Sequence, residues 1–106
     1  MFIINREYWQ IVLCSPNHPA LVRNDGSVSV GACDDVQKTI YINECLNKTF
    51  FKKVLCHELT HAAMFSYNVD LTLQQEELVA GLIATYGEEI VDITDTLFNK
   101  IKERDY

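Results

Sequence analysis

The stretch Leu55–Ala62 reads Leu-Cys-His-Glu-Leu-Thr-His-Ala, and it places two imidazoles and a carboxylate inside an apolar segment. Apolar side chains recur at helical intervals on both sides of it. The pattern predicts a helix with Asn47 or Thr49 as its N-cap and an end near Asn68. The polar side chains of the stretch would be costly among these apolar neighbours unless something satisfied them.

The spacing of the two histidines brings their rings together. Residues four apart are separated by about 40° around a helix and by one turn along it, so His57 and His61 can reach one ion. The pattern H-E-x-x-H on a helix is typical of zinc binding, and a catalytic zinc takes three protein ligands plus a water. Glu58 lies about 100° around from His57, where it is placed to contact that water rather than the metal.

A second helix is predicted after the first. Residues 72–75 fit the capping-box pattern, and apolar residues continue at spacings of three and four from Val79 to Ile101. One unbroken helix over this range would be about 45 Å long, which exceeds the size expected of so small a domain. We therefore expect a break at Gly87.

This second helix is expected to supply the third zinc ligand. Glu77 heads a face that continues through Gly81 and Ala84, small residues that would let the two helices approach closely. Glu76 is one position away, and its own face includes Ala80. Glu77 is the predicted ligand, with Glu76 as the alternative.

The N-terminal half has the pattern of strands. Tyr8–Cys14 and Thr39–Asn43 are rich in β-branched and aromatic residues, and Asn24-Asp25-Gly26 suits a hairpin turn. The predicted fold is therefore α+β: an antiparallel-rich sheet of about three strands packed on the histidine-bearing helix, followed by one or two further helices. If Thr39–Asn43 lies at the edge of the sheet, it could pair with an extended peptide.

Length and charge restrict the class of protein. A chain of 106 residues with 48% hydrophobic and 23% charged residues is expected to form one domain, residues 1–106. Its net charge of −6 disfavours nucleic acids and anionic membranes as partners. Neither a secretory signal nor a membrane-length apolar run is found, so a cytoplasmic protein is expected. The sequence does not predict an oligomeric state.

The chain resembles a minimal zincin of the glutamate-ligand type, similar to the ImmA/IrrE-like small metallopeptidases of phages and mobile elements. The likeness runs from about Gly31 to Ile90 and rests on three segments: Lys38–Ile42, Leu55–Ala62 and Glu77–Ala80. The resemblance implies that His57, His61 and Glu77 hold zinc and that Glu58 is the catalytic base.

The hypothesis that follows is a zinc metallopeptidase acting on peptide or protein substrates, in which Glu58 takes a proton from a zinc-activated water. Two alternatives stay open: a zinc-binding regulatory or interaction domain that cleaves nothing, and a metal-free domain in which the motif is accidental. The donor that would stabilise the oxyanion is unassigned. The candidates are Tyr41, Tyr67, Tyr86 and His18.

Overall fold

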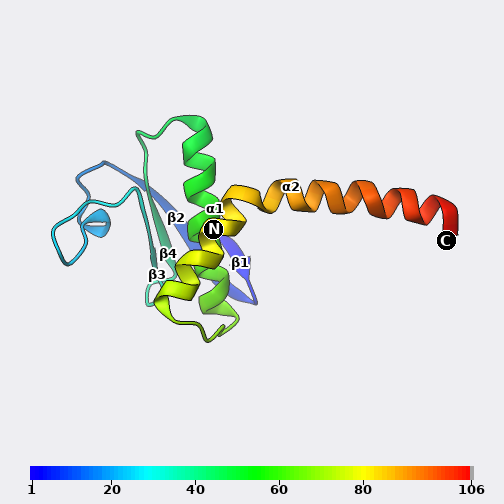
Figure 1. The fold of residues 1–106 in the computed structure, drawn as a ribbon. Helices are drawn as coiled ribbons and strands as arrows, with labels where there is room; N and C mark the ends of the chain where they lie inside the picture. Colours follow the sequence, from blue (N-terminus) through cyan, green and yellow to red (C-terminus); the bar gives the residue numbers. More distant parts are fainter. Residues whose placement is uncertain (106) are drawn as a thin grey trace.

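The computed structural model describes residues 1–105 as a four-stranded sheet followed by two helices (Figure 1). The elements in chain order are β1 (Phe2–Ile4), β2 (Glu7–Cys14), a 3-10 turn η1 (Pro19–Leu21), β3 (Gly31–Asp34), β4 (Thr39–Asn43), α1 (Lys48–Ser66) and α2 (Leu73–Asp105). The predicted α+β class is confirmed. The sheet holds one strand more than the three or so that the sequence predicts.

The order of strands in the sheet is β1-β2-β4-β3, with β2 and β4 parallel and the other two pairings antiparallel. Strand β4 is therefore paired on both sides, so the edge position that would let Thr39–Asn43 pair with a peptide is not found. The free edge next to it belongs to β3. Its sequence, Gly-Ala-Cys-Asp, lacks the β-branched and aromatic residues that favour a strand. Its extended conformation therefore depends on hydrogen bonding to β4.

The first two strands form a hairpin that the sequence reading missed. Asn5 and Arg6 both have positive φ, 47° and 65°, as the two central residues of a type I′ turn require. Arginine is an unusual residue for this conformation, so the turn carries a weak sequence signal. The Asn5 side chain also donates a hydrogen bond of 2.7 Å to the Ser66 carbonyl, which ties the hairpin to the end of α1.

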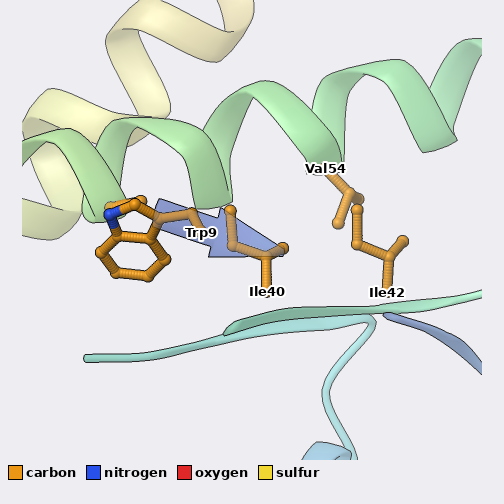
Figure 2. Close-up of a cluster of buried hydrophobic side chains, with 5 residues drawn as sticks. Trp9, Ile40, Ile42 and Val54 are labelled. Atoms are coloured by element: carbon orange, nitrogen blue, oxygen red, sulfur yellow. The ribbon is translucent and has the colours of Figure 1, made fainter. Parts of the chain in front are cut away.

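The hydrophobic core lies between α1 and the sheet (Figure 2). Ile40 and Ile42 are fully buried and point from β4 toward α1, where Val54 meets them. Trp9 is also buried, and its indole nitrogen donates a hydrogen bond of 2.8 Å to the Ser66 hydroxyl. These contacts fix α1 across one face of the sheet.

Both ends of α1 lie where the sequence predicts. Asn47 is the N-cap, and its side chain accepts a hydrogen bond of 2.9 Å from the Phe50 amide. The helix ends at Ser66 with Tyr67 as its C-cap, and Asn68 follows with a φ of 53°. The histidine motif therefore lies in the middle of a helix that is capped at its start and packed on the sheet.

Helix α2 begins with the predicted capping box but does not break at Gly87. The Gln75 amide donates to the Thr72 hydroxyl, and the Thr72 amide donates to the Gln75 side chain, at 3.1 and 3.0 Å. The helix then continues through Gly87 to Asp105, so the expected break was wrong. A glycine inside a helix costs only about 0.5–1 kcal/mol.

The long helix extends far beyond the body of the domain (Figure 1). The molecule measures 56 × 31 × 28 Å, and its radius of gyration of 16.3 Å exceeds the value of about 13 Å expected for a compact chain of this length. Over the described residues, neither helix combines the length and the apolar character needed to cross a membrane.

Candidate metal centre

Three side chains from α1 and α2 converge on one point. The Nε2 atoms of His57 and His61 are 3.2 Å apart. The carboxylate of Glu77 approaches both rings, with Oε1 2.9 Å from His61 Nε2 and Oε2 3.3 Å from His57 Nε2. The structure thus brings together the two motif histidines and the glutamate that the sequence favours as third ligand.

These separations are compatible with a zinc ion. Zinc lies about 2.0–2.1 Å from histidine nitrogen, so neighbouring ligand atoms on a tetrahedron are about 3.3 Å apart. The two histidine nitrogens are 3.2 Å apart, and each lies within 3.3 Å of one of the two oxygens of Glu77. The residues present therefore suit a small divalent cation with two nitrogen ligands and one oxygen ligand.

The second nitrogen of His61 provides a further argument for a cation. Its Nδ1 lies 2.8 Å from Oε1 of Glu76. Because a carboxylate only accepts hydrogen bonds, Nδ1 carries the proton, and a neutral ring then presents a lone pair at Nε2. In that tautomer, Nε2 faces Glu77 with a lone pair that a metal ion can accept.

Glu76 and Glu77 differ in burial. The side chains of His61 and Glu76 are only 9% and 14% exposed, whereas that of Glu77 is 54% exposed. A carboxylate on the outer nitrogen of a metal-binding histidine holds the ring in one tautomer and orientation. The two candidates of the sequence analysis therefore occupy different positions at the same centre.

The packing of α2 explains this arrangement. Ala80, one turn after Glu76, is completely buried, so the face that carries Glu76 is turned toward the body of the domain. A Cβ atom added at Gly81 would meet nothing within 4 Å. The expected close approach through Gly81 is therefore not found, and Ala80 occupies the buried position instead.

Glu58 is a buried carboxylate without a hydrogen-bond partner at one oxygen. The residue is 7% exposed, and its Oε2 atom is unpaired. Burial raises the pKa of this carboxyl to about 6, opposed by the nearby His61 and Arg23 and increased by Glu77. The group can thus accept a proton near neutral pH, and its free oxygen is available to do so.

Strand β3 passes directly over Glu58. A Cβ atom at Gly31 would lie 2.8 Å from Cγ1 of Val54 and 3.1 Å from Cγ of Glu58. The absence of a side chain at Gly31 therefore leaves room for the carboxylate between helix and strand. This close approach positions the free edge of β3 beside the three converging side chains.

A cleft of about 290 Å³ opens at this point. It is lined by the three converging side chains, by Glu58 and Glu76, by β3, and by the loop that carries Arg23. Arg23 was missed by the sequence reading, since a single arginine near a predicted turn carries no signal of its own. The predicted turn is present: Val22 and Val28 form an antiparallel bridge, and Gly26 has a φ of 85°.

Cys33 on β3 also lines the cleft. Burial, with a smaller contribution from the negative charge of Glu58, raises the pKa of its thiol to about 12. Because the thiolate is the reactive form of cysteine, this thiol is a weak nucleophile at neutral pH.

None of the four residues considered for the oxyanion lines the cleft. Tyr41 alternates with the core-facing Ile40 and Ile42 on β4, so it points to the other face of the sheet, where it stacks on His18 with 5.5 Å between ring centroids. Tyr67 and Tyr86 are 60% and 54% exposed. Arg23 is the cationic group that lies with Glu58 along the cleft.

The family model of the IrrE N-terminal-like domain, Peptidase_M78, matches residues 17–103. The chain belongs to this family. The match confirms the resemblance to the ImmA/IrrE-like small metallopeptidases and includes α1, nearly all of α2 and the loop that carries Arg23. No curated protein and no solved structure matches the chain. Membership, together with the grouping of His57, His61 and Glu77, makes the chain a metallopeptidase-like domain with side chains placed to bind a metal.

The different positions of Glu76 and Glu77 predict different losses of zinc affinity. Glu76→Gln keeps all three converging side chains but weakens the partner of His61, so affinity should fall about 10- to 100-fold. Glu77→Gln replaces a negatively charged metal ligand with a neutral one and should cause a larger loss of zinc affinity. Competition with a chromogenic chelator measures both. Glu88→Gln, on an exposed part of α2, is the control and should bind zinc as the wild type does. A larger loss for Glu76→Gln than for Glu77→Gln would contradict this assignment.

The buried Glu58 predicts a pH-dependent stability of the metal-free protein. Its pKa is raised in the folded state from 4.5 to about 6, so the stability that the protonated form provides is complete below pH 4.5 and is lost as the pH rises through 6. Glutamine carries no charge, so Glu58→Gln should be more stable than the wild type by about 2 kcal/mol near pH 7, and the gap should close near pH 4.

Urea unfolding in the presence of a chelator measures this gap. The exposed Glu89→Gln is the matched control and should show no such difference. A gap for Glu58→Gln that stays constant between about pH 4 and 7 would exclude an ionised, buried Glu58 as its cause.

Proposed function

We propose that this protein hydrolyses peptide bonds with a zinc ion held by His57, His61 and Glu77. The observation that carries the proposal is the convergence of these three side chains beside a buried carboxylate, Glu58, with an unpaired oxygen. Membership of a peptidase family supports it. The substrate class is then peptide or protein.

When bound, zinc would lower the pKa of a water and polarise the substrate carbonyl. Glu58 would accept the proton of that water at its free oxygen and return it to the leaving amine. Its raised pKa, about 6, suits both steps, because the group is mostly ionised at neutral pH and still basic enough to take a proton. Glu76 would hold the ring of His61 in one orientation through its contact with Nδ1.

The free edge of β3 is the surface on which we expect the substrate to lie. Residues 31–33 line the cleft, and β3 pairs only with β4. An extended peptide could add to this edge through main-chain hydrogen bonds, which recognise the backbone of many sequences. This role replaces the one that the sequence analysis considered for Thr39–Asn43.

The substitution Glu58→Gln tests the function. The wild-type chain loaded with zinc should cleave an unfolded protein mixture, with new peptide termini identified by mass spectrometry. Glu58→Gln should retain stoichiometric zinc and lose at least about 100-fold in cleavage rate, because the proton acceptor is gone. Removal of zinc by a chelator should abolish cleavage, and added zinc should restore it.

The alternatives give different results in the same experiment. A wild-type protein that binds zinc and cleaves nothing would support the zinc-binding regulatory or interaction domain. A protein that takes up no zinc at all would leave only the metal-free domain. Unchanged turnover in Glu58→Gln would reject Glu58 as the base.

Arg23 is our candidate for the donor that stabilises the oxyanion, since it is the arginine of the cleft and is close enough for its charge to lower the pKa of Glu58. Arg23→Gln should lower kcat about 100-fold with little change in KM, because the charge it stabilises develops only in the transition state. Arg23→Lys should recover part of kcat. Steady-state kinetics on a peptide found in the cleavage experiment measure both; a change in KM alone would assign Arg23 to ground-state binding.

A further inference from the structure

The outer part of α2 has no partner within the described chain. The last polar contact between α2 and another element joins Lys52 Nζ to Oε2 of Glu88 at 3.2 Å. Beyond Glu88, no hydrogen bond or ion pair within the described residues links α2 to the rest of the protein. Figure 1 shows this part of the helix projecting into solvent.

This projecting helix nevertheless carries an apolar face. We call this face the α2 stripe: Ile83, Tyr86, Ile90, Val91, Ile93, Leu97, Phe98 and Ile101. Their exposed fractions run from 39% for Ile83 to 58% for Val91. Five of them, residues 83, 86, 90, 93 and 97, follow the alternating spacing of three and four that lets one helix pack on another. The opposite face carries Asp92, Thr96 and Asn99, whereas Asp95 lies at the edge of the apolar face, beside Val91 and Phe98.

Such a helix needs a packing partner. Most of the stability of a helix in a protein comes from burial of its apolar face. The projecting part is also rich in β-branched residues, which lower helix propensity. A contiguous row of eight exposed apolar side chains, as in the α2 stripe, is typical of an interaction surface. The stripe is therefore a docking surface whose occupant must be helical or present an apolar groove.

The protein itself contains a groove of this kind. A hollow of about 1100 Å³ lies between the start of α1 and the middle of α2, and we call it the α1–α2 groove. Phe51 and Leu55 of α1 and Ile83 of α2 line it, and Lys48, Lys52 and Lys53 are among its polar lining residues. Ile83 belongs to both surfaces, so the groove continues directly into the stripe.

The charges that flank the stripe complement those of the groove. Residues 88–95 of α2 contain four acidic residues and no basic one, and Asp95 among them borders Val91 and Phe98 of the stripe. The groove has three lysines, and within the described residues only Lys52 among them forms an ion pair. Lys48 and Lys53 are thus free to pair with an acidic helix laid along the groove.

We propose that the occupant is a second copy of this chain, with the two α2 helices antiparallel about a twofold axis and the outer end of each α2 in the α1–α2 groove of the other. Twofold symmetry covers both stripes and both grooves with one set of contacts. The groove lies at the inner end of the stripe, so only an antiparallel arrangement brings the outer residues Leu97 and Phe98 of the second copy over it. A parallel pair would leave both grooves open.

The breadth of the apolar face supports this arrangement. Val91 and Phe98 lie to one side of the residues with three-and-four spacing, so the face is wider than the seam of a two-stranded coiled coil. A helix seated between α1 and α2 of a second copy has apolar neighbours on two sides. The wide face therefore suits a groove better than a single helix.

The mass of the full chain in solution tests the proposal. Sedimentation equilibrium should give twice the chain mass of 12.2 kDa. The double variant Leu97→Asp with Phe98→Asp should be monomeric, because it places two charges inside the interface. The matched control, Thr96→Asp with Asn99→Asp, adds the same charge to positions 96 and 99 on the polar side of the same turns and should remain dimeric. Zinc binding in each variant reports that the body of the domain is folded.

A charge exchange tests the groove separately. Lys48→Glu with Lys53→Glu should raise the dissociation constant of the dimer about tenfold, and Asp95→Lys in the same chain should restore part of the affinity. A wild-type chain that sediments as a monomer of 12.2 kDa at every concentration would overturn the proposal. So would a dimer that survives the Leu97 and Phe98 substitutions, or a charge reversal at the groove without effect. None of these outcomes depends on whether the metal centre hydrolyses peptides.

Discussion

The contact between the first turns of α2 and the middle of α1 is the constraint on which the candidate metal centre depends. Ala80 is completely buried and turns one face of α2 inward. That face delivers Glu76 to the outer nitrogen of His61, and the neighbouring position delivers Glu77 to the inner nitrogens of both histidines. One helix packing thus supplies the carboxylate that we propose as a metal ligand and the carboxylate that would orient the ring of His61.

Close packing between α1 and β3 determines the environment of Glu58. Strand β3 approaches so closely that a methyl group at Gly31 would collide with Val54 and press on Glu58. Glu58 is consequently shielded from water without being hydrogen-bonded at both oxygens, and this shielding raises its pKa. A carboxylate destabilised in this way is poised to accept a proton, so stability and the proposed chemistry oppose each other at this residue.

The first turns of helix α2 are packed against the rest of the protein, whereas its outer part is exposed. Its first turns are packed and capped, and they complete the cleft. Its outer part carries an apolar stripe that nothing within the described chain covers. The acidic segment 88–95 and the lysines of the α1–α2 groove provide the charge pattern from which we infer a second copy as partner.

The sequence by itself determined the helix of the histidine motif, a cap at Asn47 or Thr49, the capping box of α2 and the α+β class, because spacing and capping are local properties of the chain. It favoured Glu77 over Glu76 but gave neither residue a separate role, because adjacent residues share nearly the same local signal. The packing of Ala80 distinguishes their positions. The position of β4 inside the sheet, the role of Gly31 and the place of Arg23 in the cleft likewise depend on which segments meet in space. Those contacts join residues far apart in sequence, and no local pattern encodes them.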